Sequence, residues 1–304
     1  MVIFNLVEVD EAYQCYRKAG EVASSIRKIV PSITREGMKI LDLCEKIEGL
    51  IFEKGGKPAF PCNIGINEVA AHYTSPFKDE ALIPENSIVK VDFGVEVSGY
   101  IVDTSITISF NRELDLMVKA VDEALMDAIE FIKDGVKAKE AGEIIENKIK
   151  RYGFKPIRNL TGHKIERYML HTGKVIPNVS EINGSKIEAG EVYAIEPFAT
   201  TIDGAGVVID GSKAYIFRFQ KEKCSKEIRE LIKFIKENYS NFPFAFRWLK
   251  KVYPNKDLDK LFESALSQKC LIAYPVLIEA KSKPVAQAEH TIIVKKNGCE
   301  VLTS

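Results

Sequence analysis

Residues 87–110 read SIVKVDFGVEVSGYIVDTSITISF, two apolar runs joined by the turn-forming pair Ser98-Gly99. Such a pattern predicts two antiparallel strands in a hairpin. Each run is interrupted by a carboxylate, Asp92 in the first and Asp103 in the second. A loop centred near Val97-Ser98 would place the two acids directly opposite each other. A register shifted by two residues would leave them diagonal on the same face.

Two facing carboxylates repel each other, and a buried pair is costly unless a cation neutralises it. Taken alone, such a pair is more often an edge feature or a pair of hydrogen-bonded turn residues. The hairpin therefore predicts a metal site only if other residues of ligand type accompany it.

The chain contains only four histidines, and each lies in a segment that supports this interpretation. His72 stands in AAHYTSP, His163 and His171 in TGHKIERYMLH, and His290 follows Glu289 in AEHTII. The even spacing of His163 and His171 would place them on one face of a continuous extended segment. Imidazole and carboxylate are common ligands of divalent transition metals.

Two glutamates interrupt apolar runs in the same way, Glu196 in VYAIEPF and Glu289 in AQAEHTIIV. An unpaired buried carboxylate is costly, so two such positions favour a shared compensating charge. A carboxylate-rich set of this kind can hold two metal ions.

Composition limits the other function classes. With 304 residues, 46% of them hydrophobic, the chain can form one large domain or two smaller ones. The 43 basic and 43 acidic residues give no overall charge that would direct it to nucleic acid or an anionic membrane. Six scattered cysteines without a CxxC pair argue against a disulfide framework or zinc finger. Such scattered cysteines fit reduced thiols in a reducing compartment, and no apolar run of about 20 residues is present. We therefore expect a soluble cytoplasmic protein.

The order of the periodic segments predicts an α+β fold. Two helices, then strands, then two more helices and further strands suggest two similar halves around one mixed sheet. The expected helices lie near residues 8–30, 36–56, 111–135 and 139–153. Residues 221–268 differ, since they hold amphipathic helical patterns and no histidine. We interpret them as a helical insertion subdomain in a domain spanning residues 1–304; the alternative is that these helices complete the main core.

The ordered set of Asp92, Asp103, Gly-His163, His171, Glu196-Pro and Glu289-His-Thr resembles the methionine aminopeptidases. More widely it is similar to the pita-bread metallopeptidases, which include prolidase and creatinase. The resemblance covers most of the chain, in NEVAAHYTSP, VDFGVEVSGYIVDTS, LTGHKIERYMLHTGKVIP, EAGEVYAIEPFATT and YPVLIEAKSKPVAQAEHTII. The helical insertion between Glu196 and Glu289 is similar to the type 2 branch, and the short N-terminal part resembles archaeal forms.

The resemblance implies two divalent ions, with Co, Mn, Fe and Zn all open as identities. Five ligands follow from it: Asp92, Asp103, His163, Glu196 and Glu289. Asp103 and Glu289 would bridge the ions, Asp92 would be bidentate on one, and His163 and Glu196 would hold the other. A metal-bridging hydroxide would attack the carbonyl of an N-terminal methionine that precedes a small residue.

The resemblance also implies roles around these ligands. Glu196 would shuttle the nucleophile's proton, and His72 and His171 would be catalytic residues that hydrogen-bond the substrate. A methionine pocket would be lined by three residues that are equally compatible with ordinary core: Phe60, Leu170 and Tyr274. We expect His290 to point away from the site. The stretch VVIDGSKAYIFRF lacks a histidine that some type 2 enzymes carry, which leaves the fine substrate preference open.

Two alternative functions differ from this one in their sequence features. Prolidase and creatinase relatives carry a sizeable N-terminal domain, whereas only some 60 residues precede the first motif here. A pita-bread protein that binds ribosomes or RNA without catalysis typically lacks metal ligands. We expect nascent polypeptide N-termini as substrates, a monomer, and no membrane or specific nucleic-acid partner. A transient ribosome contact stays open through five lysines that also fit a merely solvated helix face: Lys221, Lys223, Lys226, Lys250 and Lys251.

Overall fold

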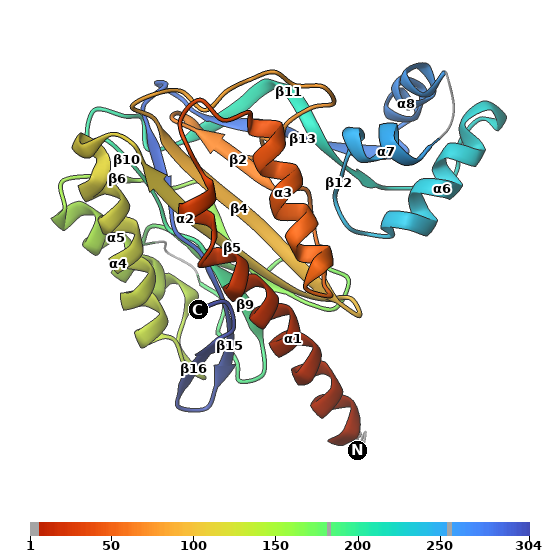
Figure 1. The fold of residues 1–304 in the computed structure, drawn as a ribbon. Helices are drawn as coiled ribbons and strands as arrows, with labels where there is room; N and C mark the ends of the chain where they lie inside the picture. Colours follow the sequence, from red (N-terminus) through yellow and green to blue (C-terminus); the bar gives the residue numbers. More distant parts are fainter. Residues whose placement is uncertain (1–5, 181–183, 254–256) are drawn as a thin grey trace.

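Figure 1 shows the computed structural model of the chain, which describes residues 6–180, 184–253 and 257–304. Its first half contains helices α1 (Leu6–Arg27), α2 (Val30–Ile33), α3 (Ile40–Glu53), α4 (Asp115–Phe131) and α5 (Ala138–Arg151). The strands of that half are β1 (Lys57–Pro58), β2 (Asn63–Ile66), β3 (Val69–Ala71), β4 (Ile88–Val97) and β5 (Tyr100–Ser109).

The second half consists of strands of two to twelve residues and one helical segment. Its strands are β6 (Lys155–Pro156), β7 (Thr161–Ile165), β8 (Val175–Pro177), β9 (Val192–Ile195), β10 (Phe198–Thr200), β11 (Val208–Phe219), β12 (Phe244–Ala245), β13 (Leu271–Glu279), β14 (Val285–Gln287), β15 (His290–Lys295) and β16 (Gly298–Val301). Its helices are α6 (Arg229–Tyr239), α7 (Phe246–Val252) and α8 (Leu258–Ser267).

The predicted hairpin is β4 and β5, and its turn lies at the predicted Ser98-Gly99 pair, one residue later than a loop centred near Val97-Ser98. Val97 pairs with Tyr100, so Ser98 and Gly99 are the two turn residues. Both have positive φ, 53° and 86°. A turn centred on Val97 and Ser98 would force a β-branched valine into this region, which is strongly disfavoured.

The shifted turn sets the register of the two acids. Asp103 pairs with Gly94, and Asp92 pairs with Ser105. Of the two registers left open by the sequence, the directly opposed one is therefore wrong and the diagonal one is correct. Because side chains alternate along each strand, both acids still face the same side of the ladder.

Two helix pairs cover the strands (Figure 1). α1 packs against the β4–β5 hairpin and α3 against α1, β1 and β2, while α4 and α5 pack together over the other half. In α4 the buried residues Met117, Val121 and Leu125 recur every four positions, which forms one apolar face. Each helix pair thereby buries its own hydrophobic cluster.

The strands form four ladders: β5-β4 with β1 and β2, β14-β10-β6, β12-β11-β13-β3 and β16-β15-β9-β7-β8. All pairings assigned among the described residues are antiparallel, so the parallel pairs that a mixed sheet implies are not among them. An isolated bridge between Ser105 and Glu289 joins the hairpin to the β15–β9–β7 ladder. This junction brings the sequence-distant acids together.

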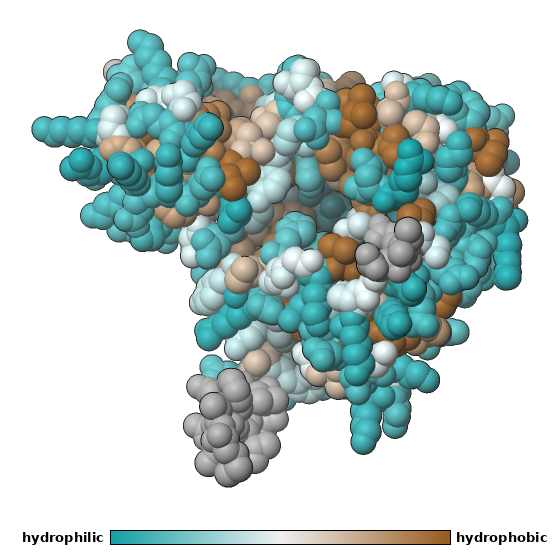
Figure 2. All heavy atoms as spheres, turned by 180° about the vertical axis from the view of Figure 1, so that it is seen from behind, coloured by the Kyte–Doolittle hydropathy of each residue, from teal (hydrophilic) through white to brown (hydrophobic). Residues whose placement is uncertain are grey.

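Helices α6, α7 and α8 form a lobe with its own apolar cluster (upper right in Figure 1). Phe244 and Phe262 lie inside this cluster. The buried Arg247 of α7 links the lobe to the rest of the chain, because its guanidinium donates to Thr74 Oγ1 at 2.7 Å and pairs with Glu48 of α3. Seen from behind in Figure 2, the surface is hollowed between this lobe and the main body.

Candidate metal centre and substrate pocket

A cavity of about 240 Å³ lies where the β4–β5 hairpin meets β7, β9 and β13. All ten residues that the sequence predicted as ligands, catalytic groups or pocket residues line it: Phe60, His72, Asp92, Asp103, His163, Leu170, His171, Glu196, Tyr274 and Glu289. We call it the central cavity.

Three of the predicted ligands form a tight group. Atoms of Asp103, His163 and Glu289 lie within 4.8 Å of one another, and all three side chains are buried. His163 Nε2 lies 3.6 Å from Asp103 Oδ2 and also 3.6 Å from Glu196 Oε1. Asp92 joins through its diagonal position beside Asp103.

The ionisation of these groups reflects their burial. Burial and the neighbouring Asp103 carboxyl raise the pKa of Asp92 well above its ordinary value. Burial and the other acids likewise raise the pKa of Glu196 and Glu289. Burial lowers the pKa of His163 to about 4, so its imidazole is neutral.

The polar atoms of the group fit a metal. Asp92 Oδ1, Asp103 Oδ1, His163 Nδ1 and Glu289 Oε2 are buried and have no hydrogen-bond partner. Leaving such atoms unpaired is costly, whereas a divalent cation satisfies carboxylate oxygens and offsets the repulsion among four acids. The donors are oxygen and imidazole nitrogen, which suit divalent transition metals.

Hydrogen bonds behind the cavity fix the strands that carry two of the acids. The Thr291 hydroxyl accepts from the Asp103 backbone N–H and donates to its carbonyl, both at 2.7 Å. Arg27 of α1 donates to the Ser105 carbonyl, to Thr104 Oγ1 at 2.9 Å and to the Glu289 carbonyl at 3.3 Å. One guanidinium therefore spans the junction of β5 with the segment of Glu289.

His72 and His171 approach the centre from different segments. His72 has a φ of 62°, a region that is sparsely populated but accessible to histidine. Its Nδ1 lies 3.2 Å from the Pro275 carbonyl oxygen. Because a carbonyl can only accept, the Nδ1 must carry the proton, which leaves Nε2 as an acceptor.

His171 reaches the site through a reversal of the chain. β7 ends at Ile165, so the expectation of a continuous extended segment is wrong. Tyr168 adopts a φ of 59°, and Glu166 pairs with Met169 in an isolated bridge. The reversal brings the ring of His171 to 4.1 Å from that of His163.

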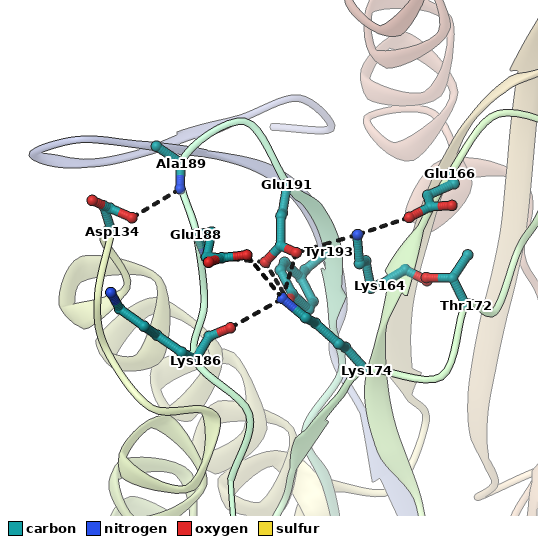
Figure 3. Close-up of polar contacts among 10 residues, drawn as sticks. All are labelled: Asp134, Lys164, Glu166, Thr172, Lys174, Lys186, Glu188, Ala189, Glu191 and Tyr193. Atoms are coloured by element: carbon teal, nitrogen blue, oxygen red, sulfur yellow. Dashed lines mark hydrogen bonds and ion pairs between the residues drawn. The ribbon is translucent and has the colours of Figure 1, made fainter. Parts of the chain in front are cut away.

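An ion-pair cluster beside this reversal holds its two arms (Figure 3). Lys164 and Lys174 both pair with Glu191 Oε1, at 3.2 and 2.6 Å, and Tyr193 donates to Glu191 Oε2 at 2.8 Å. Burial opposes the charged carboxylate, but these bonds outweigh it and lower the pKa of Glu191 to about 2. Thr172 closes the arms by donating to the Lys164 carbonyl.

The structure adds residues that the sequence reasoning missed. Asn63, Asn159, Ile216 and Leu277 also line the cavity. Asn63 Nδ2 lies 3.5 Å from Asp92 Oδ2. Asn63 stands in CNIGIN, where a polar residue opens an apolar strand, a signal that could have found it. His290 does not line the cavity, and its Nδ1 lies 2.8 Å from Thr303 Oγ1.

The chain is similar to known metallopeptidases. The model of metallopeptidase family M24 matches residues 14–233. The methionine aminopeptidase of Thermococcus onnurineus is 46% identical over 290 residues, which cover 94% of this chain and 97% of the relative.

Two solved structures share the fold. A thermophilic Arx1 has a TM-score of 0.79 at 18% identity and covers 96% of this chain and 90% of its own. Methionine aminopeptidase from Thermotoga maritima has a TM-score of 0.70 at 21% identity, with 100% and 99% covered. They confirm the predicted α+β pita-bread fold.

Family M24 consists of metallopeptidases, in agreement with the buried, unsatisfied donor set. The family match spans most of the chain, and the identity to the Thermococcus relative extends along nearly its whole length. The chain therefore belongs to metallopeptidase family M24 and, within it, to the methionine aminopeptidases.

Proposed function

We propose that the chain removes the N-terminal methionine from nascent proteins and peptides when the second residue is small, using two divalent metal ions. The observation that carries this proposal is the convergence of unsatisfied carboxylate and imidazole atoms in a cavity that also contains two further histidines. The five proposed ligands are Asp92, Asp103, His163, Glu196 and Glu289, and Asp103 and Glu289 are the proposed bridges.

When bound, the ions would lower the pKa of a water molecule and polarise the scissile carbonyl. The remaining steps fall to the side chains. Glu196 takes the proton of the attacking water and delivers it to the leaving amine. Its position beside His163, with 3.6 Å between their polar atoms, supports this role.

The two further histidines act as neutral hydrogen-bonding groups. Burial lowers the pKa of His72, and its Nε2 is free to accept from the substrate amide N–H. Burial, together with the nearby His163 and His72, lowers the pKa of His171 to about 3. A neutral His171 can donate to the oxyanion that forms at the scissile carbonyl.

The proposed methionine pocket has an apolar wall beside these groups. Phe60, Leu170 and Tyr274 line the cavity together with Ile216 and Leu277. An unbranched, polarisable thioether fits such an aromatic and aliphatic slot. Bulk at the second residue would compete with the histidines for the remaining space, which supports a preference for small residues.

We also assign the chain to the type 2 branch, with residues 221–268 as its helical insertion subdomain. The separate apolar cluster of α6, α7 and α8, between Glu196 and Glu289 in the sequence, supports this assignment. Among the described residues, no helix is both long and apolar enough to cross a membrane. Six free cysteines support a reducing, cytoplasmic location. We further propose that the protein is a monomer and that it contacts the ribosome transiently.

The test is peptide hydrolysis by the metal-loaded protein, with free methionine quantified by chromatography. Met-Ala-Ser should be cleaved, while Ala-Ala-Ser and Met-Leu-Ser should be cleaved poorly. Release from an X-Pro peptide that lacks methionine would instead indicate a prolidase-like enzyme. No hydrolysis of any peptide, together with no bound metal, would favour a noncatalytic binding module.

A further inference from the structure

A second hollow of about 470 Å³ lies beside the central cavity. We call it the outer groove. Its walls include Lys57, Ser98, Tyr168, Phe242 and Trp248. It lies between the tip of the β4–β5 hairpin and the segment of the helical lobe from the end of α6 to α7, and the mechanism makes no use of it.

The outer groove is continuous with the central cavity through shared walls. Pro243 lines both. Two more segments pass from one to the other: Pro58 lines the groove and Phe60 the cavity, while Tyr168 lines the groove and Leu170 the cavity. The β4–β5 hairpin carries its acids into the cavity and its turn into the groove.

The groove continues outward. A further hollow of about 520 Å³ shares Lys57, Asn238 and Trp248 with it and ends beside Phe52, which is 60% exposed. The volumes of the groove and of this hollow lie within the roughly 300–1,000 Å³ of sites that bind small ligands. Central cavity, groove and outer hollow therefore follow one another through shared lining residues toward the exposed Phe52.

The walls of this path are held in place before anything binds. A side chain at Gly99 would lie 2.4 Å from the Tyr168 ring, so the glycine lets that ring pack on the hairpin turn. The rings of Tyr239 and Trp248 are stacked, with their centroids 6.0 Å apart. Trp248 Nε1 donates to Glu48 Oε2 at 2.9 Å.

We propose that the outer groove binds the substrate polypeptide beyond its second residue. This inference rests on the proposed function, because cleavage at the first bond requires the remaining chain to leave the cavity. Aromatic faces contact peptides of varied sequence at low entropic cost, which suits a substrate whose downstream residues vary. The charged residues of the groove are mixed, with Lys57 against Glu96 and Glu237, so an unfolded polypeptide fits better than a polyanion.

Peptide length provides the kinetic test. A peptide of about ten residues spans roughly 33–36 Å and can follow the whole path. We expect its kcat/KM to exceed that of Met-Ala-Ser by about threefold to tenfold. Asn238→Trp, which fills the groove, should remove this advantage and leave Met-Ala-Ser hydrolysis unchanged. Phe77→Ala is a control for a surface change outside the groove. Phe77 is exposed like Asn238, but it lines a separate hollow, so this variant should keep the advantage of the long peptide.

Trp248 supplies a readout that does not depend on catalysis, because it is the only tryptophan in the chain. The probe is a long, tryptophan-free peptide whose first bond is reduced to CH2–NH and cannot be hydrolysed. It should change Trp248 fluorescence in a saturable way, whereas the three-residue analogue should inhibit without this change. Equal kcat/KM at all lengths, or no fluorescence change with the long peptide, would overturn the inference. If the unsubstituted, metal-loaded protein failed to hydrolyse Met-Ala-Ser, this result would instead contradict the proposed function.

Discussion

The rings of His163 and His171 lie 4.1 Å apart, with planes inclined by 45°, although only His163 belongs to a strand. The reversal between them brings a proposed metal ligand and a proposed oxyanion donor to the same wall of the cavity. Its geometry depends on the cluster around Glu191 on the neighbouring arms (Figure 3). The ion pairs of Glu191, which lie outside the cavity, therefore help to set the distance between His163 and His171 inside it.

Glu191→Gln should lower stability in a pH-dependent way. The pKa of Glu191 is lowered from 4.5 to about 2, so its stabilisation is present above pH 4.5 and is lost as pH falls toward 2. At neutral pH the variant should lose roughly 1.5–3 kcal/mol, as for hydrogen bonds to charged groups. Denaturant unfolding at several pH values measures this. Glu188→Gln, on a more exposed partner of Lys174, is the control, and equal losses from both would contradict the central role of Glu191.

His171→Asn should lower kcat by about 100-fold to 1,000-fold, because a donor aimed at the oxyanion is removed. The proposed metal ligands are untouched, so metal content should equal that of the unsubstituted protein. Steady-state kinetics with Met-Ala-Ser, combined with elemental analysis, tests both statements. A fall in metal content with kcat otherwise intact would assign His171 to the metal set instead.

Asp103→Asn should reduce bound metal and lower activity by more than about 100-fold, beyond the 10–100-fold typical of outer-shell changes. The substitution keeps the shape of the side chain and removes the charge that would bridge two ions. Metal binding by calorimetry checks this independently of turnover. Normal affinity for two ions in this variant would exclude Asp103 as a bridge.

Arg27→Met should weaken metal binding by about tenfold to 100-fold, although Arg27 does not line the cavity. Its guanidinium holds the carbonyls of Ser105 and Glu289 together, and methionine keeps the bulk but loses these bonds. Arg27→Lys, which keeps the charge without the planar fork, should recover part of the affinity. The absorption spectrum of bound Co²⁺ reports any change in ligand geometry. An unchanged spectrum and affinity would show that α1 has no positioning role.

The hairpin and its acids could be predicted because period-two alternation and the Ser98-Gly99 turn are local signals. The exact register could not be read with the same certainty, since one residue of turn position decides whether Asp92 faces Asp103 or Ser105. The positive φ required of the turn residues settles that choice.

The reversal at Tyr168 escaped the sequence reasoning for a different reason. An even spacing between two histidines fits a strand, but the chain reverses between Lys164 and Lys174, which both pair with Glu191 just before β9. Long-range contacts of this kind leave no periodic trace. Arg27 was missed likewise, because a single arginine on a helix does not reveal which carbonyls it reaches.

The most direct test of the account is methionine release from Met-Ala-Ser by metal-free protein to which Co²⁺ or Mn²⁺ is added stepwise. We predict negligible release without metal and full activity once the proposed centre is loaded with about two equivalents. Undiminished methionine release from protein shown by elemental analysis to be metal-free would contradict the central claim.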